Sequence, residues 1–154
     1  MPNDEMPLKI RRGGVEDVEV VAPLFDAYRQ FYEQASDVAG ARVFLRERLT
    51  KSESVLFVAQ IGGEVVGFTQ LYPVFTSVGM KPIWRLNDLY VKQDRRQLGA
   101  GEALMNAALE FAKQSGAKRV ELETEITNAP ARALYDGLGM KLGTKFVKYT
   151  IDVN

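Results

Sequence analysis

Residues 85–105 read Arg-Leu-Asn-Asp-Leu-Tyr-Val-Lys-Gln-Asp-Arg-Arg-Gln-Leu-Gly-Ala-Gly-Glu-Ala-Leu-Met, and this stretch decides the fold. The β-forming residues at 86–91 predict a strand, because they precede an abrupt polar break. After the break, apolar residues at helical spacing predict a helix that runs to about Ser115. The members of that apolar stripe are Leu104, Ala107, Ala108, Phe111 and Ala112. A basic turn that contains glycines therefore joins a strand to a helix.

The turn has the composition of a phosphate-binding loop. Gly99 and Gly101 at the start of the helix let the backbone approach a ligand closely. Free N–H groups and the positive end of the helix dipole favour a phosphate there. Lys92, Arg95 and Arg96 add positive charge around the same point. An ordinary strand-to-helix turn, with glycines for tight packing, is the alternative interpretation.

Two common phosphate loops do not fit the turn. A dinucleotide fingerprint requires a third glycine where this chain has Leu104. A nucleotide P-loop requires a lysine after its last glycine, and Glu102 occupies that position.

Length and composition limit the class of protein. The chain has 154 residues, which suits one domain, and 20 basic residues balance 20 acidic ones, so its charge does not indicate a nucleic-acid partner. It contains neither cysteine nor histidine, which excludes thiolate catalysis, Ser-His-Asp catalysis and the commonest zinc ligands. No apolar run approaches the ~18 residues of a membrane span, and residues 1–7 do not resemble a signal peptide. We expect a cytoplasmic protein without a metal, a nucleic-acid partner or a membrane partner.

The whole pattern predicts one mixed α/β domain at residues 8–154 behind a flexible leader at residues 1–7. Strands are predicted at 8–12, 54–61, 64–72, 82–91 and 120–124, with a last strand from the alternation of Val147, Tyr149, Ile151 and Val153. Helices are predicted at 15–35, from an Asp37 cap through Lys51, from the glycine turn to Ser115, and from about Asn128 to before Gly139. Pro73 is expected to end the third strand. The second helix is expected to face inward with Val43, Phe44, Leu45 and Leu49.

Two motifs in this pattern resemble one known family. Arg-x-x-Gly-x-Gly at 96–101, after a strand that ends Leu-x-Val, resembles the acyl-CoA loop of the GNAT superfamily of N-acetyltransferases. One strand later, residues 128–140 (Asn-Ala-Pro-Ala-Arg-Ala-Leu-Tyr-Asp-Gly-Leu-Gly-Met) look like the family element Asn-x-x-Ala-x-x-Leu-Tyr-x-x-x-Gly-Phe, with Met140 in place of the aromatic residue. Phrases at 67–72 and 86–89 resemble a bacterial subgroup related to fungal histone and D-amino-acid acetyltransferases. The resemblance implies a single-domain GNAT fold with four helices and a mixed, mostly antiparallel sheet, in which the parallel fourth and fifth strands splay apart.

The resemblance also implies the site residues. Acetyl-CoA would be the co-substrate, with its pyrophosphate on the loop made of Arg96, Gln97, Leu98, Gly99, Ala100 and Gly101. The backbone of Leu89, Tyr90 and Val91, beside a β-bulge on the fourth strand, would bind the pantetheine amides. Asn128 would contact the pantetheine arm, and Tyr135 would protonate the departing thiolate as the catalytic acid. The alternatives are a plain helix cap for Asn128 and a packed core aromatic for Tyr135.

The resemblance implies direct attack of a primary amine on the acetyl thioester. The amine must first lose a proton, because an alkylammonium has a pKa near ~10.4. In the histone-acetylating branch the base is a glutamate on the fourth strand, but counting back from the loop places Arg85 there. Asp88, Glu121 and Glu123 are the substitutes, and each can equally be a structural charge.

The acceptor is expected to be a small-molecule amine. Tyr28, Phe31 and Tyr32 at the end of the first helix, with Tyr72 and Phe75 around Pro73, would form a compact aromatic enclosure. The substrate-binding candidates in it are Tyr32, Tyr72 and Asp88. Two alternatives remain open: acetylation of a protein lysine or N-terminus, and an acyl-CoA-binding domain without activity. A homodimer is a further expectation, since dimers are common in the family.

Overall fold

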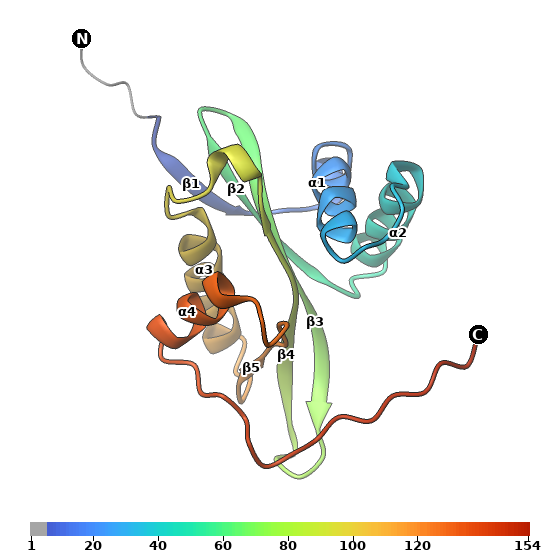
Figure 1. The fold of residues 1–154 in the computed structure, drawn as a ribbon, viewed down its shortest axis with the longest axis vertical. Helices are drawn as coiled ribbons and strands as arrows, with labels where there is room; N and C mark the ends of the chain where they lie inside the picture. The colour runs from blue at the N-terminus through green and yellow to red at the C-terminus, as the bar shows by residue number, and fades with distance from the viewer. Residues whose placement is uncertain (1–5) are drawn as a thin grey trace. The chain divides into compact units, whose positions relative to one another are not determined.

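The structure is a computed structural model that describes residues 6–154 in two compact units, one that ends at Leu122 and one that starts at Glu123. The first unit is built on a five-stranded sheet with strand order β1-β2-β3-β4-β5 (Figure 1). Its strands are β1 (Leu8–Arg12), β2 (Val55–Ile61), β3 (Glu64–Thr76), β4 (Lys81–Val91) and β5 (Val120–Glu121). Its helices are α1 (Val18–Phe31), α2 (Val38–Thr50) and α3 (Ala100–Gln114), and α4 (Ala129–Gly137) lies in the second unit. Residues 1–5 of the expected leader lie outside the described residues.

The sheet is mixed, as predicted. Strands β1 to β4 pair in antiparallel order, whereas β5 runs parallel to β4 because α3 crosses between them. The β4–β5 pairing covers only Trp84 with Val120 and Arg85 with Glu121. From Leu86 onward, β4 has no strand partner on the β5 side among residues 6–154. This is the predicted splay, and it leaves backbone groups of β4 unpaired.

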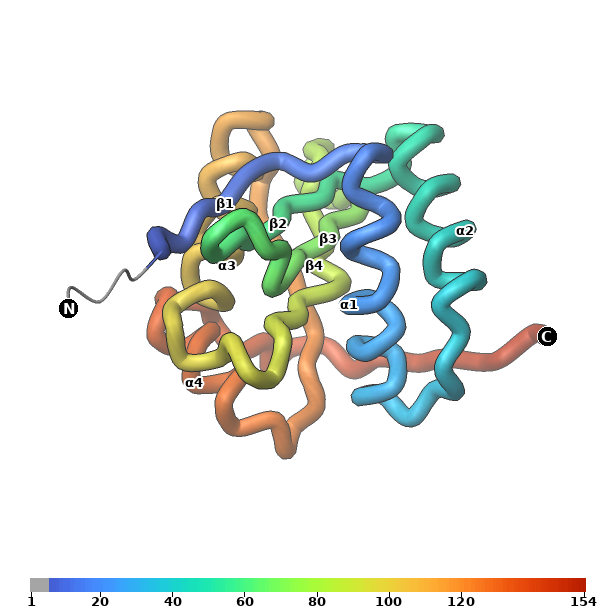
Figure 2. Tube along the Cα trace, turned by 90° about the horizontal axis from the view of Figure 1, so that it is seen from above, coloured from blue at the N-terminus to red at the C-terminus, as the bar shows by residue number. Residues whose placement is uncertain are grey.

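Helices cover both faces of the sheet. Figure 2 shows α1 and α2 side by side over one face and α3 over the other. The period of two along β2 explains this arrangement, since Leu56 and Val58 are fully buried in the core under α1 and α2. On the opposite face, Ala59 and Val66 pack against Leu104 of α3. The sheet thus holds both the glycine loop, through α3, and the side of β4 that faces α1.

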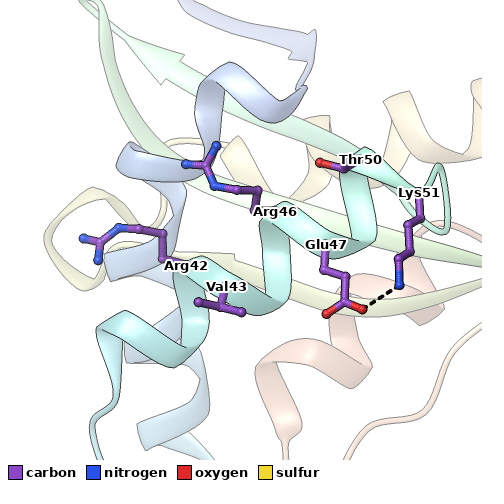
Figure 3. Close-up of a pocket in the computed structure, with 6 residues that line it drawn as sticks. All are labelled: Arg42, Val43, Arg46, Glu47, Thr50 and Lys51. Atoms are coloured by element: carbon purple, nitrogen blue, oxygen red, sulfur yellow. Dashed lines mark hydrogen bonds and ion pairs between the residues drawn. The ribbon is translucent and has the colours of Figure 1, made fainter.

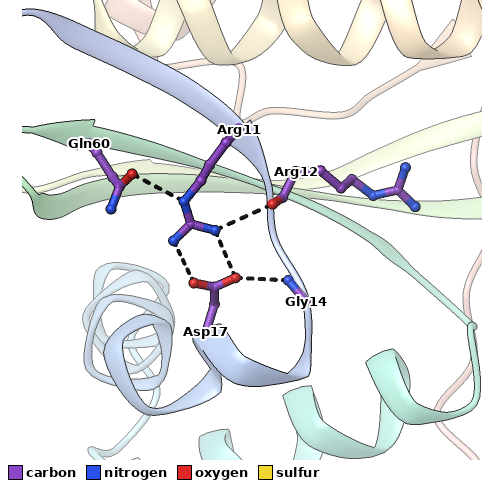
Figure 4. Close-up of polar contacts among 5 residues, drawn as sticks. All are labelled: Arg11, Arg12, Gly14, Asp17 and Gln60. Carbon is purple, nitrogen blue, oxygen red and sulfur yellow. Dashed lines mark hydrogen bonds and ion pairs between the residues drawn. The ribbon is translucent and has the colours of Figure 1, made fainter.

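An ion pair fixes the start of α1 to the sheet. Both nitrogens at the tip of Arg11 bond the carboxylate of Asp17, at 2.6 and 3.0 Å, and its Nε donates to Gln60 Oε1 (Figure 4). The backbone N–H of Gly14 also donates to Asp17. Asp17 is buried, and the Arg11 hydrogen bond holds the pKa of its carboxyl below its usual value.

Three local predictions are wrong. The first helix ends at Phe31 rather than 35, because Glu33 adopts a left-handed conformation with φ of 63°. Strand β3 continues through Pro73, since its pairing with β2 ends at Leu71 and a missing N–H is tolerated where a strand has an open side. In α2, whose Asp37 cap is confirmed by a bond from Gly40 N, Val43 is 65% exposed and Phe44 also lies at the surface.

The predicted last strand is also wrong. Residues 140–154 form no helix and no strand in the structure. Val147, Tyr149, Ile151 and Val153 alternate as expected, but each is at least 79% exposed. An alternating pattern specifies a strand only if an edge is available to pair with it.

Candidate active site

The glycine loop is shaped by two left-handed residues. Gln97 has φ of 65° and Gly99 has φ of 85°, and Gly99 is the cap residue before α3. Glycine adopts this conformation at no steric cost, whereas a side chain at Gly99 would be strained. The loop therefore turns sharply into the start of a fifteen-residue helix.

The amides at the start of α3 fit a phosphate. The first backbone donor of the helix with a partner is Ala103 N, which bonds Gly99 O at 3.0 Å. The N–H groups of Ala100, Gly101 and Glu102 have no acceptor among residues 6–154. Such unpaired donors at the positive end of a helix are the donor set that a pyrophosphate requires.

The basic residues of the loop do not all remain mobile. Glu64 Oε1 accepts from Lys92 Nζ at 2.8 Å, and its Oε2 accepts from Arg95 at 3.1 Å. These two bonds lower the pKa of the Glu64 carboxyl. Arg96 instead donates from Nε to Val91 O and lies 5.5 Å from the centre of the Tyr90 ring. Arg96 is therefore the basic side chain of the loop that no carboxylate neutralises in the described chain.

Strand β4 carries the expected bulge. Asp88 pairs with Gln70 and Leu86 pairs with Leu71, so Asn87 is the extra residue. After the bulge, Leu89, Tyr90 and Val91 are half-buried. Tyr90 packs against α1, whereas Leu89 and Val91 pack on the α3 side. The structure thus brings these residues together with the glycine loop at one end of β4.

Asp88 is a buried carboxylate beside this bulge. Its side chain is 3% exposed, and Oδ2 accepts from Gln70 Nε2 at 2.7 Å while Oδ1 accepts from Asn87 Nδ2 at 3.1 Å. Burial raises the pKa of the Asp88 carboxyl despite side-chain hydrogen bonds from Gln70, Asn87 and Tyr28, because burial disfavours the charged form more than these bonds favour it. A carboxylate with a raised pKa is a stronger base than an ordinary carboxylate.

Sequence reasoning missed Gln70. It is fully buried, and its Oε1 atom has no hydrogen-bond partner among the described residues. A buried amide oxygen without a donor is rare, and residues 6–154 supply no donor for it. The available signal was a long polar side chain in the centre of a mostly apolar strand.

The aromatic residues gather only in part. Tyr28 donates to Asn87 O at 3.0 Å, and its ring lies 5.1 Å from Tyr32 and 6.5 Å from Tyr90. Phe31 joins this group through Tyr32. Phe75 is 80% exposed, so the prediction that it belongs to the enclosure is wrong.

Tyr72 is half-buried on the same sheet face as Gln70 and Asp88. Burial first, and the negative charge of Asp88 second, raise the pKa of its hydroxyl, so Tyr72 stays protonated as a hydrogen-bond donor.

A second buried carboxylate fixes the segment after Tyr32. Asp26 accepts from Asp37 N at 2.6 Å, from Ser36 Oγ at 2.7 Å and from Gln30 Nε2 at 3.0 Å. These bonds lower the pKa of Asp26, so its carboxyl stays ionised. The α1–α2 connection is thereby held by a charged anchor.

The other candidate bases differ from Asp88. Arg119 binds Glu121 at 2.7 Å, and Lys148 binds Glu123 at 2.6 Å, both at the surface. Arg85 pairs in register with Tyr72 on β3 and with Glu121 on β5. Of the three acidic candidates, Asp88 alone is buried.

The second unit carries the remaining two site residues. Asn128 caps α4 with Oδ1, which accepts from Ala131 N at 3.2 Å, so the cap interpretation holds for that atom. Its amide nitrogen is not used by the cap. Tyr135 is half-buried on α4, two turns beyond Asn128.

A pocket lies elsewhere, on α2. Figure 3 shows its lining residues Arg42, Val43, Arg46, Glu47, Thr50 and Lys51. Two of these, Glu47 and Lys51, bind each other at 2.7 Å. None of the predicted site residues lines it, so we do not assign the chemistry to this pocket.

Among the described residues, no helix is both long and apolar enough to cross a membrane.

Known proteins resemble this chain along most of its length. Residues 21–140 match the family described as Acetyltransferase (GNAT) family. The uncharacterized N-acetyltransferase YhfO of Bacillus subtilis is 49% identical over 146 residues, which cover 95% of this chain and 98% of that protein. A probable acetyltransferase of Haemophilus influenzae is 32% identical over 117 residues, which cover 75% of this chain and 80% of that protein.

A solved structure is similar along nearly the whole chain. The crystal structure of a probable acetyltransferase superposes with a TM-score of 0.89 at 34% identity, covering 95% of this chain and 98% of that one.

Proposed function

Because the chain belongs to the GNAT family of acetyltransferases, we propose that it transfers an acetyl group from acetyl-CoA to the primary amine of a small molecule, in the cytoplasm. The single observation that carries the choice of acceptor site is the buried pair of Asp88 and Gln70. It offers a carboxylate and an unpartnered amide oxygen beside the unpaired stretch of β4. A primary ammonium group would satisfy both acceptors.

The proposed co-substrate would be held by atoms already described. Acetyl-CoA supplies an activated thioester when it is bound. The N–H groups of Ala100, Gly101 and Glu102, with the Arg96 guanidinium, would hold its pyrophosphate. The unpaired backbone of Leu89–Val91 would hold its amide arm as a strand neighbour holds a strand.

In the proposed mechanism, Asp88 takes the proton from the bound ammonium group. Its raised pKa suits this step, because it brings the pKa of the base closer to the amine pKa of ~10.4 and so makes the proton transfer less unfavourable. Gln70 Oε1 holds a second N–H of the amine and so orients its lone pair. Direct attack on the thioester then needs no covalent enzyme intermediate, which agrees with a chain that lacks cysteine and histidine.

Tyr135 is the proposed proton donor to the leaving thiolate. In Tyr135→Phe the ring and its packing stay while the hydroxyl is lost, so kcat should fall about 100-fold with the affinity for acetyl-CoA unchanged. We place the effect at the low end of the general-acid range, because a thiol pKa near ~8.5 makes thiolate a tolerable leaving group. Tyr149→Phe, at a 90% exposed tyrosine of the same unit, should keep the parent kcat. Normal turnover of Tyr135→Phe would return Tyr135 to a packing role.

The aromatic residues of α1 should select a small acceptor. We expect small amines, with or without an aromatic part, to exceed lysine-containing peptides in kcat/KM, measured as free CoA release. Tyr32→Ala should lower kcat/KM for the preferred amine about tenfold, since a ring–cation contact contributes roughly 0.5–2 kcal/mol. Phe75→Ala is the control, because Phe75 lies outside the aromatic group. If peptides are the better substrates, the protein-acetylating alternative replaces this one, and if no acceptor is turned over, the domain only binds acyl-CoA.

A further inference from the structure

Three buried polar atoms without a hydrogen-bond partner gather around the centre of strand β3. They are Gln70 Oε1, Ser54 Oγ and Arg48 Nε, and none of them is paired within residues 6–154. Gln70 is fully buried, and Ser54 is 7% exposed. A buried polar atom that stays unpaired costs free energy, so a group of three marks a place where a ligand can supply the missing partners.

Ser54 and Tyr72 face the same side of the sheet as Gln70. Leu56 pairs in register with Gln70 and is buried under α1 and α2. Ser54 lies two residues before Leu56, Tyr72 lies two residues after Gln70, and alternate residues of a strand share a face. Ser54 and Tyr72 therefore lie opposite one another on the face that these two helices cover.

Arg48 reaches the same place from the last turns of α2. Ala41 and Leu45 of this helix are buried, and Arg48 follows them at helical spacing, with only 22% of its side chain exposed. Its backbone oxygen accepts from Glu53 N at 2.8 Å, which places Arg48 beside the residue that precedes Ser54. The guanidinium is thus directed inward, unlike the exposed basic groups of α2.

Two carboxylates already contact Arg48, and they leave donors available. Glu47 Oε1 lies 3.1 Å from its Nη2, and Glu53 Oε1 lies 3.5 Å from its Nε. Both glutamates are close to half exposed, and Glu47 also binds Lys51. Exposed ion pairs of this kind are weak, and a guanidinium has five N–H donors, so Arg48 can still bind an anion.

Tyr72 is influenced by charges of both signs. Burial is the main cause of the raised pKa of its hydroxyl, the negative charge of Asp88 adds to the rise, and the positive charge of Arg48 opposes it. Both charges must lie near this hydroxyl to act on it. The site therefore has a negative end at Asp88 and a positive end at Arg48.

We propose that the acceptor amine also carries a carboxylate, as a free amino acid does, and that Arg48, Ser54 and Tyr72 bind this carboxylate. This inference rests on the proposed function, which places the amine at Asp88 and Gln70. One guanidinium and two hydroxyls suit the two oxygens and the single charge of a carboxylate. A peptide has an amide in its place and would leave the donors of the positive end unpaired.

Paired acceptors test the assignment. Each free amino acid of a panel is compared with its primary amide, which has nearly the same shape but no negative charge. In the parent, kcat/KM for the preferred amino acid should exceed that for its amide about 10- to 100-fold, because the amide loses charge-assisted hydrogen bonds. Arg48→Gln should lower this preference about tenfold or more, and Ser54→Ala should lower it in the same direction. The ratio cancels differences in the amount of folded enzyme.

Arg46→Gln is the matched control. Arg46 lies on the same helix, is 49% exposed and binds Glu19 at 3.3 Å. Figure 3 shows it among the residues of the surface pocket on α2. This variant should keep the preference of the parent. A parent that favours no amino acid over its amide, or an Arg48→Gln variant with the parent's preference, overturns the proposal.

Binding without turnover separates this proposal from the proposed function. In ¹⁵N-labelled protein the Nε–H group of Arg48 gives its own NMR signal, which is identified by its absence from the spectrum of Arg48→Gln. With coenzyme A present, an amino acid should shift this signal in a saturable way, whereas its amide at the same concentration should not.

The two measurements fail in different ways. A shift without acetylation of any acceptor would refute acetyl transfer and keep the carboxylate site. Acetylation of amines without a shift would refute the carboxylate site and keep acetyl transfer. The absence of a shift with every amino acid of the panel overturns the proposal in either case.

Discussion

Gly99→Glu should abolish the binding of coenzyme A while the protein stays folded. Gly99 has φ of 85°, and among the described residues no heavy atom beyond its neighbours along the chain lies within 4 Å of where a Cβ would stand, so the new side chain has room but meets strain. That strain costs roughly 1–2 kcal/mol, too little to unfold a typical domain. The carboxylate would lie at the amides of Ala100 and Gly101, where it repels the pyrophosphate and competes for its donors. Losing two charge-assisted hydrogen bonds, at about 1.5–3 kcal/mol each, weakens binding by ~100-fold or more.

Gly116→Glu provides the matched control for this variant. Gly116 lies just past the other end of α3, has φ of 78° and also has open space around the Cβ position. The substitution adds the same side chain, the same charge and similar backbone strain at a site distant from the loop along the helix. Calorimetry with coenzyme A should therefore show parent-like affinity for Gly116→Glu and none for Gly99→Glu. Equal affinity in the two variants would show that the loop is not part of the coenzyme A site.

The sequence predicts those parts of the fold that rest on local chemistry. Gly62 and Gly63 form the turn between the predicted strands β2 and β3 with φ of 60° and 82°, Asp37 and Asn128 cap their helices, and Gly116 follows α3. Each of these residues acts on its own neighbours along the chain. Side-chain type and spacing are enough to predict such features without knowledge of the rest of the fold.

Features that depend on a partner distant in the chain were not predictable in the same way. Pro73 fits inside β3 only because β2 stops pairing at Leu71, which no local pattern reveals. The alternation at 147–153 is correct as a pattern, but a strand also requires an edge, and the sequence does not say which edge or whose.

The candidate site shows the same division. The glycine loop is a local motif, and its residues were predicted by number. Gln70 was not predicted, because its significance lies in an unpartnered oxygen beside Asp88, eighteen residues away in the sequence. In the sequence, Asp88 is one of three acidic candidates. The structure distinguishes it, because Asp88 is buried whereas Glu121 and Glu123 are not.

Asp88→Asn should lower kcat/KM for the amine by ~10²–10⁴-fold, because it removes the proposed base and keeps the shape of the side chain. Its effect on stability should have the opposite sign from that of a structural carboxylate. Burial raises the pKa of Asp88 in the folded protein, so its contribution favours folding below the pKa of the unfolded chain and is lost as pH rises through the folded value. At pH 7 the variant should therefore be at least as stable as the parent.

Asp17→Asn is the control for that argument, since Asp17 and Asp88 are 4 and 3% exposed. Arg11 lowers the pKa of Asp17, so Asp17 stabilises the fold above its unfolded pKa, and this contribution is lost as pH falls through the folded value. Thermal unfolding at pH 7 should show a loss of about 1–3 kcal/mol for Asp17→Asn and no loss for Asp88→Asn. Activity should show the reverse, with near-parent turnover for folded Asp17→Asn.

The pH dependence separates a base from a residue that only binds the amine. In both parent and Asp88→Asn the fraction of neutral amine in solution rises tenfold per pH unit below ~10.4, so that effect cancels in the ratio of their kcat/KM values. The ratio should be large above the raised pKa of Asp88, where the parent carboxyl is ionised, and should fall toward one below it, where the parent carboxyl is protonated. A ratio near one at every pH would show that Asp88 takes no part in the reaction. A large ratio that does not change across the pKa of Asp88 would show that Asp88 binds the amine as a polar contact and that its ionisation plays no part in the reaction.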